Sequence, residues 1–167
     1  GHVLGICVGY QMLGRSGAEP EGIEGPPGTT EGLGFLDSTT VMQGNKRTDL
    51  VHGRAHQSGL PITGYEIHIG QTEGPDCARP WLSIADNDAA RLEGAMDRTG
   101  RIRGCYVHGM FGEDAFRSAF LEALSGHHQG QTLSYSDSVE ATLDVLAAHL
   151  EEHVDIDALL AIAQTRR

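Results

Sequence analysis

The sequence predicts a three-layer α/β domain, and three observations support that class. Short apolar runs, some of them alternating with polar residues, fill the first two thirds of the chain as strand candidates. Apolar residues at helical spacing fill the last third. A glycine-flanked junction near the start joins the first strand candidate directly to a helix candidate. Strands followed by helices that can cover them favour layered α/β packing.

The N-terminal part of the chain alternates between regular segments and one long loop. Residues 2–6 predict a short buried strand, and residues 9–13 predict the first turns of a helix. Residues 15–34 are rich in Gly, Pro and Glu, and their prolines block regular structure, so we expect an exposed loop. Residues 35–42 predict the next strand.

The middle of the chain supplies further strand candidates. Residues 64–70 alternate apolar and polar side chains with a period of two, which is typical of a strand with one buried face. Residues 81–85 and 92–96 are weaker candidates. Residues 102–108 form a stronger apolar run, which ends at His108.

Three helices are predicted toward the C-terminus. The first begins at Glu113 and Asp114, because acidic residues favour the positive end of the helix dipole. The stretch Ser136-Asp137-Ser138 offers an N-cap for the second helix. Asp155 or Asp157 is expected to cap the third.

Composition narrows the range of partners. The length of 167 residues suits one domain over residues 1–167, with a full-sized core. A formal net charge of −11 argues against nucleic acid and against an anionic membrane surface as partners. We therefore expect a small-molecule substrate.

The cysteines and the chain start bear on the cellular context. Three widely spaced cysteines do not form a disulfide framework, and they fit the reducing cytoplasm. No run approaches the roughly 20 apolar residues of a membrane span, and no leader pattern is visible. The chain has no initial Met and enters a strand candidate at once, so we expect an upstream segment that is absent from this sequence.

The stretch around Cys7 carries most of the chemical information. A cysteine with Gly5 and Gly9 two residues to either side predicts a strand–turn–helix elbow, where a sharp turn leaves no room for bulk. The following helix would point its positive end at the sulfur and favour the thiolate. The backbone N–H of Val8 would then face an oxyanion. The alternative is a cysteine that is merely buried in a tight strand–helix junction.

His108 is the candidate base. It stands at the end of a predicted strand, and catalytic groups collect at strand ends in open α/β sheets. Its imidazole could take the proton of the Cys7 thiol and return it to a leaving group. The alternative is a histidine that is satisfied by a backbone partner in a turn.

These residues resemble the class I glutamine amidotransferases, and in particular the cobyric acid synthase family. The resemblance covers nearly the whole chain in the same order. The matching stretches are the elbow Gly5-x-Cys7-x-Gly9-x-Gln11 with its continuation through Gly14, and residues 32–36, 64–70, 104–111 and 114–117. The related family that amidates cobyrinic acid has the same layout, with motifs less similar to these.

The resemblance implies a flavodoxin-like domain that hydrolyses glutamine to glutamate and ammonia. Cys7 and His108 would be the catalytic residues, with Val8 and Gln11 in substrate binding, and no metal or cofactor in this chain. The family's domain begins upstream of Gly1, so this chain would be N-terminally truncated. An N-terminal ATP-dependent synthetase domain would hold Mg-ATP and the corrinoid, and would amidate adenosylcobyrinic acid a,c-diamide to adenosylcobyric acid in cobalamin biosynthesis.

This sequence departs from the pattern at some positions and leaves others open. Val8 stands where the family usually has Gly, and Met110 stands where many class I members carry an acid that orients the histidine. We therefore expect a Cys–His dyad. Glu66 and His68 either line the glutamine pocket or form a solvated strand face.

Other readings were weighed against this one. The pattern from His149 to His153 matches one zinc-peptidase motif, but little chain follows it to supply a third ligand. Cys77 and Cys105 are expected to be chemically inert, and no ATP-binding motif is evident. Alternative functions are the glutaminase of cobyrinic acid a,c-diamide synthase, a cysteine hydrolase of the dienelactone hydrolase kind, or a non-catalytic docking domain.

Overall fold

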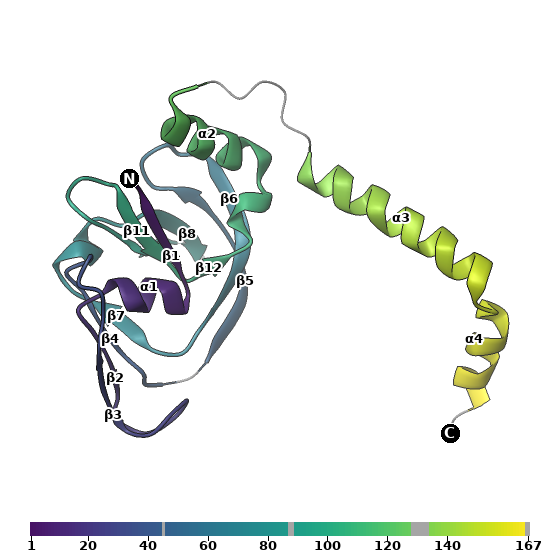
Figure 1. Ribbon diagram of the computed structural model, residues 1–167, viewed down its shortest axis with the longest axis horizontal. Helices are drawn as coiled ribbons and strands as arrows, with labels where there is room; N and C mark the ends of the chain where they lie inside the picture. Colours follow the sequence, from purple (N-terminus) through teal and green to yellow (C-terminus); the bar gives the residue numbers. More distant parts are fainter. Residues whose placement is uncertain (45, 87–88, 128–133, 166–167) are drawn as a thin grey trace. The chain divides into compact units, whose positions relative to one another are not determined.

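The structure is a computed structural model that describes residues 1–44, 46–86, 89–127 and 134–165 (Figure 1). The chain divides into two units, Gly1–Gln129 and Gly130–Arg167. The first unit mixes strands and helices, and the second is helical where it is described. The α/β class predicted from the sequence is confirmed, with the strands distributed over three sheets.

The first sheet carries the strand–helix junction. Strand β1 (Val3–Ile6) pairs in parallel with β11 (Ile102–Cys105), which pairs antiparallel with β10 (Ala95–Met96). Helix α1 (Val8–Leu13) follows β1 after a single residue and lies beside this sheet (Figure 1). The register places Ile6 opposite Cys105, so strands β1 and β11 end at the same edge of the sheet.

The second sheet is antiparallel and has five strands. Its order is β12 (Val107–His108), β6 (Pro61–His68), β5 (Arg47–Ala55), β8 (Leu82–Asp86) and β9 (Ala89–Glu93). Strand β5 was not predicted from the sequence, because few of its side chains are apolar and most are exposed.

The predicted strand over residues 102–108 is divided by the structure. Strands β11 and β12 belong to different sheets, and Tyr106 lies between them. The backbone N–H of Tyr106 donates to the side-chain Oε1 of Glu93 at 2.8 Å, in place of a partner on a neighbouring strand. One segment of chain therefore links the elbow sheet to the five-stranded sheet.

The third sheet corrects the expected loop over residues 15–34. Strands β2 (Ser16–Glu19) and β3 (Gly28–Glu31) form an antiparallel hairpin, with the prolines confined to the connection between them. Strand β4 (Thr39–Val41) pairs with β2, and β7 (Gln71–Glu73) pairs with β4. Backbone pairing in this sheet overrides a weak strand propensity.

The main core of the first unit is formed by the five-stranded sheet, the first sheet and α2 (Asp114–Ser125). Its buried side chains include Val51, Ile62, Trp81, Ile84, Val107, Met110 and Phe116. Short 3-10 turns, η1 (Pro75–Ala78) and η2 (Met110–Gly112), carry the chain past this core. The helix predicted at Glu113 is confirmed, with Glu113 itself as the N-cap residue.

The second unit contains two helices, α3 (Tyr135–His153) and α4 (Ile156–Thr165). The predicted N-cap for α3 is wrong by two residues, because the side chain of Ser134 accepts the N–H of Asp137. Asp155 caps α4 by accepting the N–H of Ala158, which confirms one of the two predicted caps. Within the described ranges, no helix has the length and apolar character to cross a membrane.

The packing of α1 on β11 predicts a stability effect at Gly104. A Cβ atom there would overlap the ring of Tyr10, which is 2% exposed. We expect Gly104→Ala to lower the free energy of unfolding by about 1–3 kcal/mol in urea denaturation, because the core cannot accept the methyl group.

The matched control is Gly17→Ala in β2, where an added Cβ meets nothing within 4 Å. It should raise the free energy of unfolding by up to about 1 kcal/mol, by restricting the unfolded chain. Equal effects of the two substitutions would contradict the packing described here.

Candidate active site

Cys7 occupies a strained turn between β1 and α1. Its backbone angles are φ 55° and ψ −119°, and among the described residues it is the one non-glycine with positive φ. Its N–H donates to the carbonyl of Cys105 at 2.9 Å, and its own carbonyl accepts the N–H of Tyr10 at 2.9 Å. The sharp elbow predicted from the sequence is confirmed.

The two glycines that flank Cys7 differ in the space around them. A Cβ on Gly5 would lie 2.6 Å from the backbone carbonyl group of Gly9, so β1 and α1 approach too closely for any side chain there. A Cβ on Gly9 itself would meet nothing within 4 Å. The expectation that both positions must lack bulk is therefore supported by contacts at Gly5 alone.

Cys7 and His108 converge on one short stretch of β6. The Cys7 thiol donates to the backbone carbonyl of Ile67 at 3.4 Å. His108 pairs across the sheet with Tyr65, two residues before Ile67. The Nε2 atom of His108 is buried and has no hydrogen-bond partner, so it remains available for proton transfer. The catalytic roles of Cys7 and His108 remain predictions.

The candidates for an orienting acid that lie near His108 in the sequence have other surroundings. Met110 is fully buried in the core. Glu113 is the N-cap residue of α2, and Asp114 forms an ion pair with Arg117 at 2.6 Å. The expected Cys–His dyad remains a prediction.

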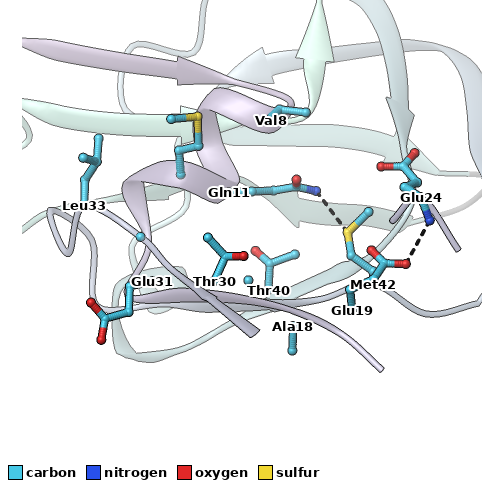
Figure 2. Close-up of a pocket in the computed structure, with 13 residues that line it drawn as sticks. Val8, Gln11, Ala18, Glu19, Glu24, Thr30, Glu31, Leu33, Thr40 and Met42 are labelled. Atoms are coloured by element: carbon cyan, nitrogen blue, oxygen red, sulfur yellow. Dashed lines mark hydrogen bonds between the residues drawn. The ribbon is translucent and has the colours of Figure 1, made fainter. Parts of the chain in front are cut away.

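A cavity of about 370 Å³ opens beside the elbow (Figure 2). One wall is the first turns of α1, and the other is the β2–β3 hairpin with the adjoining end of β4. The side chains that enclose it include Val8, Gln11, Met12, Thr30, Thr40 and Met42. Val8 is 56% exposed, so its side chain points away from the core and does not crowd the elbow.

Gln11 reaches across this cavity with its amide held on one side (Figure 2). Its Nε2 lies 3.4 Å from the carbonyl oxygen of Ile69 and 3.4 Å from the hydroxyl of Tyr106. The Ile69 carbonyl can only accept, which sets the amide nitrogen on that side and leaves Oε1 as an acceptor for a ligand.

Glu66 is buried and pairs with the partly buried His68, so the alternative of a solvated strand face is wrong. Glu66 is 2% exposed, and its carboxylate contacts His68 Nε2 at 3.1 Å, Arg47 at 3.3 Å and Arg91. Burial raises the pKa of Glu66, but the hydrogen bond from His68 and the charges of Arg91 and Arg47 outweigh it and leave that pKa below its ordinary value. These side chains line a second cavity, with Tyr106 and Glu93.

Tyr106 and Glu93 were missed by sequence reasoning. The ring of Tyr106 stacks on the imidazole of His68, with centroids 3.9 Å apart. Glu93 is 6% exposed, and burial raises its pKa to about 7, although the Tyr106 N–H hydrogen bond opposes the shift. A glutamate that follows a weak strand gives no local signal of this environment.

Neither Cys77 nor Cys105 has the setting of a reactive thiol. Burial raises the pKa of the Cys105 thiol well above its ordinary value and also raises that of Cys77. His149 and His153 are one turn apart on α3, and His153 Nδ1 contacts the His149 carbonyl at 2.9 Å. No group of three metal-ligating side chains occurs in the part of the chain that the structure describes.

Comparison with known proteins adds an independent finding. The profile of the CobB/CobQ-like glutamine amidotransferase domain matches residues 1–116. A cobyric acid synthase from Cereibacter sphaeroides is 58% identical over 98% of this chain and 33% of that protein. Cobyric acid synthases from Rhodobacter capsulatus and a Bradyrhizobium species are 56% and 49% identical, again over 98% of this chain. The chain spans about a third of the length of these curated relatives.

The strained backbone at Cys7 predicts that a residue free of this strain would make the protein more stable. Glycine adopts positive φ without a Cβ clash, whereas alanine keeps the strain. We expect Cys7→Gly to exceed Cys7→Ala in free energy of unfolding by about 1–3 kcal/mol, measured by urea denaturation. Both variants lack the thiol, so the comparison isolates the backbone term. Equal stabilities would contradict a strained elbow.

The buried carboxyl of Glu93 predicts a pH dependence of stability. Its pKa rises from 4.5 to about 7 on folding, so the folded state binds more protons between these values. The contribution of Glu93 to the free energy of unfolding is therefore fully present below pH 4.5. It is lost as the pH rises through about 7, and the total loss is about 3 kcal/mol at most. Glu93→Gln keeps the acceptor for the Tyr106 N–H and should abolish this decline in urea titrations at pH 5 to 8. An unchanged pH profile would contradict it.

Proposed function

Because the chain belongs to the family of CobB/CobQ-like glutamine amidotransferase domains, we propose that it hydrolyses glutamine and releases ammonia for a synthetase. The observation that carries the proposal is the strained Cys7 elbow, whose thiol faces the same stretch of β6 as His108. A strained nucleophile at a strand–helix junction is typical of covalent catalysis.

The reaction begins with attack on the side-chain amide of glutamine. The Cys7 thiolate forms a bond to the amide carbon, and the proton of the thiol passes to His108. The carbonyl oxygen becomes an oxyanion. As the first residue of α1, Val8 has an N–H without an acceptor inside the helix, and this N–H is placed to stabilise that charge.

The second half of the reaction releases the two products. His108 returns its proton to the amide nitrogen, the carbon–nitrogen bond breaks, and ammonia leaves. A γ-glutamyl thioester then remains on Cys7. His108 takes a proton from water as the water attacks the thioester, and the carbon–sulfur bond breaks to give glutamate and free Cys7.

The cavity beside α1 is the proposed glutamine pocket. Its volume of about 370 Å³ suits a small ligand, and both Val8 and Gln11 line it. The free Oε1 of Gln11 can accept a hydrogen bond from an N–H of the substrate. The hydroxyls of Thr30 and Thr40 add polar groups to an otherwise apolar lining.

The wider reaction involves a part of the protein beyond this chain, which spans about a third of the relatives. We propose that ammonia passes to an ATP-dependent synthetase domain of the same polypeptide, as in a cobyric acid synthase. That domain would bind Mg-ATP and amidate a corrinoid, adenosylcobyrinic acid a,c-diamide. The high identity to several cobyric acid synthases over 98% of the chain supports this assignment.

Covalent labelling tests the nucleophile and the pocket together. A glutamine analogue with a diazoketone should modify Cys7, as read by peptide mass spectrometry, and excess glutamine should protect it. Cys77→Ala should label normally, because burial raises the pKa of that half-buried thiol and disfavours its reactive thiolate form. Well-folded protein that labels elsewhere, or not at all, would contradict a glutaminase site and favour a docking domain.

Glutaminase assays test the base. We expect His108→Ala to lower kcat by about 10²–10⁴-fold, the usual contribution of a general acid–base residue. The control is His52→Ala, which removes an exposed imidazole on β5. A loss of similar size in both variants would argue against a specific role for His108.

A further inference from the structure

The pair of Glu66 and His68 has no part in the proton transfers proposed above, yet its contacts lead to Gln11 in the proposed pocket. We infer that His68, held by Glu66, is a positioning residue that sets the orientation of Gln11 through Tyr106. This inference rests on the proposed glutaminase function and adds a determinant of glutamine affinity. Each step follows from contacts on β6, α1 and the link between β11 and β12.

The first step is the locked ring of His68. Its Nδ1 lies 3.0 Å from the carbonyl oxygen of Gly70, and its Nε2 lies 3.1 Å from a carboxylate oxygen of Glu66. Both partners are acceptors, and they lie on opposite sides of the ring. Contacts on both sides hold the ring in one orientation.

Glu66 itself is held from two other strands. Arg47 on β5 contacts its Oε2 at 3.3 Å, and Arg91 on β9 contacts the same oxygen. The other oxygen, Oε1, is thereby left for His68. A carboxylate that is 2% exposed stays charged here because two arginines and the His68 imidazole contact it.

The next step is the contact between the His68 ring and the ring of Tyr106. The imidazole of His68 and the Tyr106 ring are nearly parallel, at 13°, with centroids 3.9 Å apart. Stacking of the two rings restricts the position of the Tyr106 side chain. The hydroxyl of Tyr106 also contacts that of Thr72, so the ring is held both along its face and at its end.

The last step reaches Gln11. Its amide nitrogen has two oxygen acceptors, the Tyr106 hydroxyl and the carbonyl of Ile69, each at 3.4 Å. The Ile69 carbonyl belongs to the backbone, so the Tyr106 hydroxyl is the acceptor whose position depends on the His68 ring. If the ring is lost, the amide loses one of its two oxygen acceptors, and Oε1 faces the ligand in a less fixed direction.

The test is steady-state glutaminase kinetics on the full chain with His68→Gln and Tyr106→Phe. Glutamine at position 68 keeps a donor but loses the ring, and phenylalanine at position 106 keeps the ring but loses the hydroxyl. We expect each variant to raise KM for glutamine by about 3- to 10-fold, the value of one hydrogen bond, with kcat changed by less than about twofold.

The double variant shows whether the two residues act along one path. If His68 acts on Gln11 through Tyr106, the double variant should have nearly the KM of either single variant. Multiplied effects would overturn that path. Tyr106→Phe leaves the charged cluster intact, so it provides the test even where His68→Gln does not fold.

Asp76→Asn is the matched structural control. Asp76 is a carboxylate of 7% exposure that pairs with Arg79 and accepts the N–H of Asp37, without contact to Gln11. We expect Asp76→Asn to lower Tm about as much as the two test variants do, and to leave KM for glutamine unchanged. An equal rise in KM, or an unchanged KM in both test variants of an active protein, would overturn this inference alone. Folded wild-type protein without glutaminase activity would overturn the proposed function and this inference with it.

Discussion

The active-site geometry depends on one constraint, the reversal of the chain at Cys7. Parallel pairing of β1 with β11 ends in the hydrogen bond from Cys7 N–H to Cys105 O at 2.9 Å. Helix α1 begins at the next residue, so the full change of direction falls on Cys7, with φ 55°. The strain persists because the pairing on one side and the close contact of Gly5 with α1 on the other over-determine the turn.

Alternate residues of β6 contact two different groups of residues. One group is Cys7 and His108, and the other is the charged cluster around Glu66. Tyr65 pairs with His108, and the Ile67 carbonyl meets the Cys7 thiol. Glu66 and His68 alternate with them and point to the other side, where the arginines and Tyr106 lie. A shift of this strand by one residue would exchange the two sets, so its register is tied to the formation of the site.

The crossing at Tyr106 joins these parts into one unit. The chain leaves the elbow sheet after Cys105 and enters the five-stranded sheet at Val107. At that point the Tyr106 N–H is satisfied by the buried Glu93, and the Tyr106 ring packs between α1 and His68. The Tyr106 N–H thus depends on a carboxyl that is buried between the two sheets, and this burial raises the pKa of Glu93 to about 7.

The sequence alone determined the local features of this protein. The elbow at Cys7, the strands around Ile67 and before His108, and the helix after Glu113 were all predicted, because glycine spacing and apolar periodicity act over a few residues. Only the tertiary structure decided the β2–β3 hairpin, the break at Tyr106, and the burial of Glu66 and Glu93. A period-two pattern shows that a strand has two different faces, but it does not show what covers each face. That information lies in partners distant in sequence, such as Arg91 for Glu66 and Glu93 for Tyr106.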